Sequence, residues 1–150
     1  MRLTICITAC LGVALLGSLL TRPALKPWYA GLAKPRWTPP NWLFGPAWTI
    51  LFLAMATAAW LVWSQSGLTA VPMRLFLLQL LLNVAWSAVF FHFRSPGAAF
   101  IEIIVLWCAI LITTIAFRNI VPLAAWLMIP YLLWVTYAAA LNFTIWRLNS

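Results

Sequence analysis

The hydrophobic residues of this chain lie in long uninterrupted runs rather than in alternating patterns. The runs cover about Leu3–Leu20, Asn41–Trp63, Pro72–Phe91, Gly97–Phe117 and Val121–Trp146. Each has about the 20 residues that an α-helix needs to cross a hydrocarbon core of about 30 Å. Strands of a membrane barrel would run only about 10 residues and would alternate in polarity. The pattern predicts an all-α integral membrane protein, a five-transmembrane-helix bundle in one domain over residues 1–150.

The first run begins like a signal peptide, because Arg2 is followed by an apolar stretch. It is long for such a segment and no clean small-residue cleavage pattern follows it, so we interpret it as a retained helix. Small side chains recur in it every four residues, at Cys6, Cys10, Ala14 and Ser18. Such a stripe lets another helix approach closely, although chance in an alanine-rich chain would give the same pattern.

The connections between runs are short except for the first, Thr21–Pro40, which is long enough to suggest a function. Its prolines exclude a continuous helix, and its aromatic residues add stiffness. We therefore expect a lid folded over one end of the bundle. Pro40 can start the second span, and Pro46 then either kinks its first turns or delays its start.

Composition supports the membrane interpretation: 66% of the residues are hydrophobic, 7% are charged, and the mean hydropathy is +1.03. A soluble domain carries roughly 25% charged residues. The net charge of +8 does not indicate nucleic-acid binding, because the cations are scattered between apolar runs rather than gathered on one polar face. We expect them to anchor the protein at lipid headgroups.

The distribution of cations also predicts the orientation in the membrane. With five spans, the N-terminus and the second and fourth loops share one side, which carries Arg2, Arg74 and Arg118. The other side carries Arg22, Lys26, Lys34, Arg36, Arg94 and Arg147. By the excess of positive residues on the cytoplasmic side, we expect the first loop and the C-terminus in the cytoplasm and the N-terminus outside.

Polar residues within the spans indicate which faces meet protein. Glu102, the only acidic residue, should face the bundle interior or a cavity, since a charged group at the helix centre costs at least about 2.5 kcal/mol. Three spans carry stripes of aromatic residues with a few amides: Gln79, Asn83, Trp86 and Phe90; Trp48 and Phe52; Tyr131, Trp134, Ala138, Leu141 and Asn142. Interfacial tryptophan belts are the alternative, and account well for Trp37 near a span end. An apolar pocket with sparse polar groups is the usual form of a small-molecule site.

No set of residues suggests a metal or hydrolytic centre. Cys6, Cys10 and Cys108 lie within apolar runs, and His92, the only histidine, has no second ligand nearby in the pattern. Paired carboxylates, a Ser-His-Asp set and a glycine-rich phosphate loop are all missing. We therefore expect no metal and no required cofactor, and a hydrolase or an ATP-driven pump is not indicated.

Three segments resemble one family closely and in the same order along the chain. They read "WYAGLAKPRWTPPNWLFGPAWTILF", "LLNVAWSAVFF" and "IPYLLWVTYAAALNFTIWRLNS". In these segments the chain resembles the translocator protein family, whose members are also called tryptophan-rich sensory proteins or peripheral benzodiazepine receptors. The resemblance covers the chain from Trp28 onward, and the first span matches only in hydrophobicity.

The resemblance implies a bundle that is commonly a homodimer and binds porphyrins such as protoporphyrin IX or haem, and in many members benzodiazepine-type drugs and sterols. The implied pocket lies between the second and fifth spans under the first loop. Together with the stripes it gives these candidate ligand-binding residues: Tyr29, Trp37, Trp48, Phe52, Asn83, Trp86, Phe90, Glu102, Trp134, Ala138 and Leu141. Lys34 and Arg36 would meet a ligand's carboxylates.

The family's sterol motif needs a tyrosine between an apolar residue and a cation. Here the stretch offers Leu141, Phe143 and Arg147, so the hydroxyl is missing and weaker cholesterol binding is expected. Two functions stay open: a sensor, regulator or transporter that binds tetrapyrroles, or an enzyme that degrades porphyrin in light and oxygen. In the second case Trp48 and Trp134 would be the catalytic residues. We expect a bacterial inner-membrane location.

Overall fold

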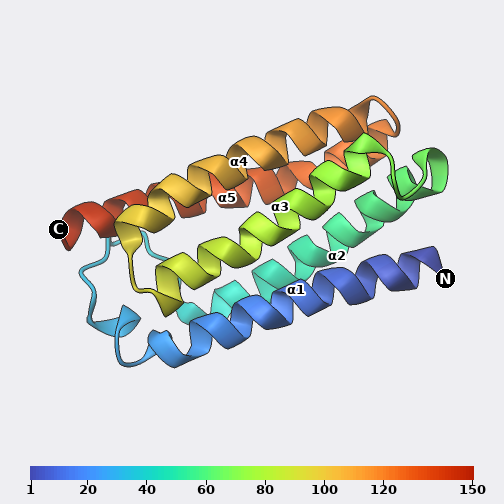
Figure 1. Cartoon of the computed structure of the whole chain (residues 1–150). Helices are drawn as coiled ribbons and strands as arrows, with labels where there is room; N and C mark the ends of the chain where they lie inside the picture. Colours follow the sequence, from blue (N-terminus) through green and yellow to red (C-terminus); the bar gives the residue numbers. More distant parts are fainter.

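A computed structural model describes residues 1–150, and it is a bundle of antiparallel helices without strands (Figure 1). Five helices are long and apolar enough to cross a membrane, which confirms the predicted fold class. The elements are α1 (Arg2–Leu25), η1 (Tyr29–Gly31), α2 (Asn41–Ser66), α3 (Val71–Ser87), η2 (Ala88–His92), α4 (Pro96–Arg118) and α5 (Pro122–Leu148).

The two ends of the bundle differ in how the chain turns. The N-terminus lies at the same end as the short α2–α3 and α4–α5 turns (Figure 1). The first loop, the α3–α4 turn and the C-terminus lie at the opposite end, which we call the loop end. With five spans the two termini lie at opposite ends of the bundle. The turns near Arg74 and Arg118 are therefore at the end of the N-terminus, and the first loop, the α3–α4 turn and the C-terminus are at the other end, as the sequence pattern predicts.

The core of the bundle is made from buried side chains of all five long helices, from alanines to aromatic residues. Residues of α2 and α5 that are fully buried include Met55, Ala59, Met128 and Tyr131. Phe76 of α3 and Phe117 of α4 stack with ring centroids 5.8 Å apart. The outward faces stay apolar, with side chains such as those of Leu81 and Ile101 about 70% exposed. That pattern suits a bundle surrounded by hydrocarbon rather than water.

The first helix is longer than the sequence pattern indicated. We expected the span to end near Leu20, but α1 runs to Leu25 with Pro23 inside its last turn. A proline this close to the end removes a single backbone hydrogen bond, so the helix continues through it. The connection to α2 therefore begins at Lys26, and α2 starts directly after Pro40 and runs through Pro46 without delay.

The third span ends in a turn of π-helix, η2, whose backbone hydrogen bonds span one residue more than those of an α-helix. Because of this wider turn, the adjacent Phe90 and Phe91 are both buried. Their ring centroids lie 4.7 Å apart. Arg94 then adopts the left-handed backbone conformation (φ 53°) and reverses the chain into α4. The π-turn therefore brings two rings, instead of one, under the first loop.

Candidate functional site: an aromatic cavity at the loop end

A cavity of about 460 Å³ opens into the loop-end half of the bundle. Its walls come from the second half of α1, the first half of α2, the second half of α3 with η2, and the middle of α5. The lining residues are Val13, Ala14, Leu15, Gly17, Ser18, Thr21, Arg22, Leu25, Tyr29, Asn41, Phe44, Gly45, Trp48, Thr49, Phe52, Asn83, Trp86, Ser87, Phe91, Trp134 and Ala138. Volume and lining are typical of small-molecule sites.

The tryptophans of α2 and α5 form the aromatic wall of the cavity. The rings of Trp48 and Trp134 meet edge to face, with centroids 6.3 Å apart. Phe44 stands edge to face against Trp134 at 6.1 Å, and Phe52 lies 5.6 Å from Trp48. Edge-to-face contacts between rings are a favourable arrangement, so these rings hold one another in place along the cavity wall.

A hydrogen-bonded group of three side chains forms the inner boundary of the cavity. The Tyr131 hydroxyl donates to Gln79 Oε1 at 2.9 Å and accepts from Asn83 Nδ2 at 2.8 Å. Gln79 and Tyr131 are fully buried, whereas Asn83 lines the cavity. Because each buried polar atom here has a partner, the group fixes α3 against α5 at this level.

A second set of hydrogen bonds orients Trp86. Its indole Nε1 donates to Asn142 Oδ1 at 2.9 Å, and Asn142 Nδ2 donates to the Pro96 carbonyl at 2.7 Å. The bonds connect α3, α5 and the start of α4. The face of Trp86 is thereby held toward the cavity while its polar edge is satisfied. Asn142, which the sequence placed beside the α5 stripe, supports the site rather than lining the main cavity.

Trp134 differs from Trp86, because its Nε1 is buried and has no hydrogen-bond partner. A buried N–H without a partner costs about 1–3 kcal/mol. Trp134 lines the cavity, but its Nε1 is enclosed by protein atoms and does not face the open space. Ala138, one turn further along α5, leaves space beside the ring.

The first loop covers the loop end of the bundle through Tyr29. This side chain is buried and its ring packs against Phe90 and Phe91, at 6.3 and 5.7 Å. The Lys34 ammonium lies over the Tyr29 ring at 4.7 Å and donates to the carbonyls of Tyr29 and Leu32 at 2.7 and 3.1 Å. Burial, and then the nearby Tyr137, raise the pKa of Tyr29 above its usual value, so Tyr29 stays neutral at physiological pH.

The far part of the loop is fastened to α5. Ala33 exchanges two hydrogen bonds with the Asn149 side chain, at 3.0 and 2.9 Å. The Tyr137 hydroxyl donates to the Trp37 carbonyl at 2.6 Å, and the two rings meet edge to face at 5.6 Å. Trp37 is about half exposed and does not line the cavity. Its role in this structure is to dock the loop.

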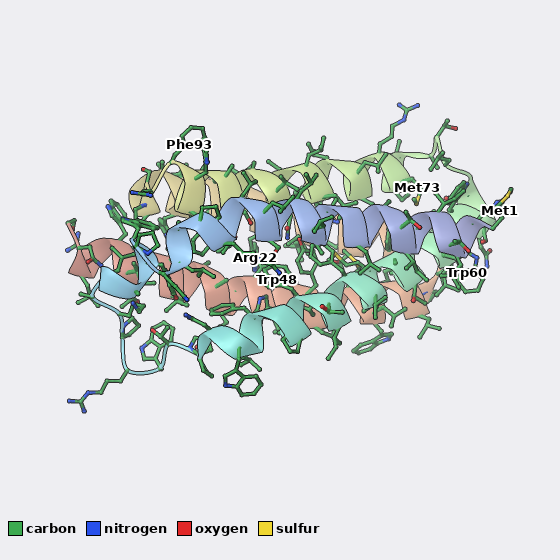
Figure 2. All side chains as sticks on the ribbon, turned by 90° about the horizontal axis from the view of Figure 1, so that it is seen from below. Met1, Arg22, Trp48, Trp60, Met73 and Phe93 are labelled. Atoms are coloured by element: carbon green, nitrogen blue, oxygen red, sulfur yellow. The ribbon has the colours of Figure 1, made fainter.

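The cation in the cavity wall is not one of the two that the sequence favoured. Lys34 is engaged by backbone carbonyls and the Tyr29 ring, and exposed Arg36 lies outside the cavity. Arg22, on the last turns of α1, lines the cavity instead, as Trp48 does (both labelled in Figure 2). Arg22 was not predicted as a cavity residue, because the first span was expected to end near Leu20 and Arg22 was therefore placed in the loop.

Seven of the predicted ligand-binding residues line the main cavity: Tyr29, Trp48, Phe52, Asn83, Trp86, Trp134 and Ala138. Phe90 and Leu141 line an adjoining cavity of about 30 Å³ instead. Sequence reasoning missed Phe44 and the wall formed by α1. The recurrence of Ala14 and Ser18 on the small-residue stripe was the available signal for that wall, but we read it only as a packing surface.

Glu102 lines neither cavity. Its side chain is half-buried, and both carboxylate oxygens are buried without a hydrogen-bond partner. The carboxyl group therefore lies among protein atoms, but away from the place where a ligand would sit. The assignment of Glu102 as a ligand contact does not match its position.

The three residues of the sterol-like motif do not all lie on one face of α5. Leu141 is buried, whereas Phe143 is 43% exposed and Arg147 is exposed on the outer surface. The Phe143 ring packs beside Phe100 at 5.1 Å. The motif does not form one continuous surface in this structure, although Phe143 and Arg147 share the outward face.

The fold and the cavity show a helical membrane protein with an aromatic cavity at the loop end of the bundle. Residues 6–147 match the model of the TspO/MBR family. The chain is 44% identical to the tryptophan-rich protein TspO of Chlorobaculum tepidum, over 98% of this chain and 95% of that protein. It is 42% identical to the human translocator protein (81% and 75% covered) and 38% identical to the tryptophan-rich sensory protein of Cereibacter sphaeroides (86% and 82% covered). The chain belongs to the TspO/MBR family.

Proposed function

We propose that this protein binds porphyrins or related tetrapyrroles in the aromatic cavity and acts through that binding as a sensor, regulator or transporter. A porphyrin is a flat aromatic ring system with carboxylate tails on one edge. A flat, apolar ligand of this kind fits a cavity whose walls are indole and phenyl rings. The protoporphyrin IX or haem would be a ligand, not a resident cofactor.

The observation that carries this proposal is the edge-to-face pair of Trp48 and Trp134 on one wall of the cavity, beside the small Ala138. Two fixed indole rings offer stacking surface, and Ala138 leaves a gap beside them. An aromatic contact contributes about 0.5–1.5 kcal/mol beyond the area it buries. The names of relatives, a translocator in one case and a sensory protein in another, agree with a protein that handles a small molecule.

The test is a titration of the purified protein with protoporphyrin IX, followed by the porphyrin's absorbance. Trp134→Ala should weaken binding by about fivefold to tenfold, because it removes one stacking wall. Trp60→Ala is the matched control. Trp60 lies on the same helix as Trp48, but outside the cavity and at the end of the bundle where Met1 lies (Figure 2). Equal loss in both variants, or no binding by the wild type, would contradict the proposal.

A second function is supported by the same pair of rings. Two indoles 6.3 Å apart on the wall of a porphyrin site could carry oxidising equivalents between the ligand and dissolved oxygen under light. The protein would then degrade porphyrin, with Trp48 and Trp134 as catalytic residues. Illumination of the complex in air should produce a new absorbing product that Trp48→Phe and Trp134→Phe abolish. An unchanged porphyrin spectrum would contradict degradation, and binding would remain as the only proposed function.

We propose that the loop end faces the cytoplasm of a bacterial inner membrane and that the protein forms a homodimer. The six cations of the loop-end side support this orientation against three on the other side. A cysteine introduced at Ser150 should be protected from a membrane-impermeant thiol reagent in intact cells, while one at Thr69 should react. The opposite labelling pattern would show that the proposed orientation is wrong. The homodimer is tested separately by the mass of the protein in mild detergent, and the mass of a monomer would contradict it.

A further inference from the structure

We propose that Arg22 is the anion-binding residue of the cavity and selects ligands that carry a carboxylate at the edge of an apolar ring system. The inference rests on the proposed function, which it deepens by naming the group that the ligand must present. Its basis is the position of one side chain, and the lack of any partner for it within the protein.

Arg22 stands at the mouth of the cavity rather than deep inside it. It is exposed, yet it is one of the lining residues, together with the buried Tyr29 and with Asn41 at the start of α2. Trp48 lines the same cavity, and Figure 2 labels Arg22 and Trp48 in the same part of the molecule, where α1 passes the first half of α2. A ligand whose rings lie against Trp48 would thus place its edge near the guanidinium.

The guanidinium has no anionic partner among the acidic side chains. Glu102 is the only carboxylate side chain of the protein, and its oxygens are buried away from the cavity without a hydrogen-bond partner. No side-chain hydrogen bond within the protein engages Arg22, although Lys34 and Asn149 nearby are both engaged. A forked guanidinium without a partner is well suited to a carboxylate, which it can bind through two parallel N–H···O bonds.

The other cations of the loop end do not compete for this role. Lys34 is held by carbonyls and by the Tyr29 ring. The remaining four are exposed and line neither cavity: Lys26, Arg36, Arg94 and Arg147. With one positive side chain on an otherwise neutral lining, the site distinguishes ligands by the charge at one edge. It should prefer a porphyrin with free propionates to one whose propionates are esterified.

The experiment compares protoporphyrin IX with its dimethyl ester, which has the same ring system but no carboxylate. Wild-type protein should bind the free acid about fivefold to tenfold more tightly than the ester, the range expected for a partly exposed charge-assisted hydrogen bond. Arg22→Gln should remove that preference by weakening only the acid, and Arg22→Lys should retain part of it. High salt should reduce the preference of the wild type and leave the Arg22→Gln variant unchanged.

Lys26→Gln is the matched control, because it removes one charge four residues further along the chain, at the C-cap of α1 and outside the cavity. It should leave the acid-to-ester ratio unchanged. If Arg22→Gln also leaves that ratio unchanged, or lowers affinity for acid and ester alike, Arg22 does not recognise the ligand's carboxylate and the inference is wrong. If the wild type binds neither compound, the proposed porphyrin function itself fails, and this outcome is separate from the others.

Discussion

The pair α1–α2 is packed tightly at the N-terminal end of the bundle and held open at the loop end. At the tight end, Cys6 and Cys10 belong to the same buried cluster as Ala56 and Ala59. At the open end, the same small-residue stripe continues through Ser18, but α2 presents Trp48 to it across a cavity. The same kind of side chain on α1 therefore serves close packing at one end and a ligand space at the other.

A stripe of small residues on one helix therefore predicts a close contact only when the facing residues of the other helix are small as well. Lipid gives helices no hydrophobic reason to associate, so contact depends on shape. Small side chains on both helices let the backbones approach. Bulky rings that lean against one another, as Trp48 and Trp134 do, cannot collapse onto the opposite helix. Residual space remains there, and it is lined by aromatic surface.

The largest effect should come from filling the open end. Ala138→Phe places a ring in the cavity and should lower affinity for protoporphyrin IX by about a hundredfold, since a ligand would have to displace a packed side chain. Ala140→Phe, on the exposed face of the same helix, should leave affinity unchanged. Absorbance titrations measure both. Similar losses in the two variants would mean that the cavity is not the binding site.

Overfilling the tight end should affect stability instead of binding. Ala59 is fully buried, so Ala59→Leu should lower the free energy of unfolding by about 1–3 kcal/mol and reduce the Tm in detergent. Ala9→Leu, on the exposed side of α1, is the control and should have little effect. Porphyrin affinity of the folded Ala59→Leu protein should stay close to that of the wild type. A large loss of affinity would show that the two ends are coupled.

The boundary between the two ends can be tested through Tyr131. Tyr131→Phe removes one hydroxyl and leaves Gln79 and Asn83 without their shared partner, at a cost of about 1–2 kcal/mol of stability. Because Asn83 lines the cavity, ligand affinity should also fall. The change in binding free energy should be smaller than the change in the free energy of unfolding. Thermal unfolding and porphyrin titration measure the two effects. An unchanged Tm would indicate that the three-residue hydrogen-bonded group contributes nothing.

The smallest effect concerns the attachment of the loop. Asn149→Ala removes both side-chain bonds to Ala33, so amide exchange in the loop around Ala33 should accelerate by about fivefold. The Tm should stay unchanged, because the helices do not depend on this contact. Ser150→Ala, at the next position, should leave exchange as it was. Unaltered exchange in the Asn149 variant would mean that Trp37 and Tyr137 alone hold the loop.

Some of the site could be predicted from the sequence because helical spacing places side chains on faces. Trp48 and Phe52, four residues apart, line the cavity as one face of α2, and Trp134 and Ala138 do so on α5. Phe90 departs from its stripe because η2 is a π-turn, which shifts the faces by part of a turn and moves this ring into the adjoining cavity. Arg22 was missed because Pro23 made the end of α1 look like the start of a loop.

The sequence by itself determined that the chain spans a membrane with five helices, since runs of about 20 apolar residues have no other stable arrangement in hydrocarbon. It also determined which α2, α3 and α5 faces carry aromatic and amide groups. Only the tertiary structure decided which of these faces enclose a space, and that α1 with Arg22 closes one wall. It also decided that Glu102 and Trp37 stay outside that space. The reason is that a helix period fixes the direction of side chains within one segment, whereas a cavity depends on the distances between helices that packing sets.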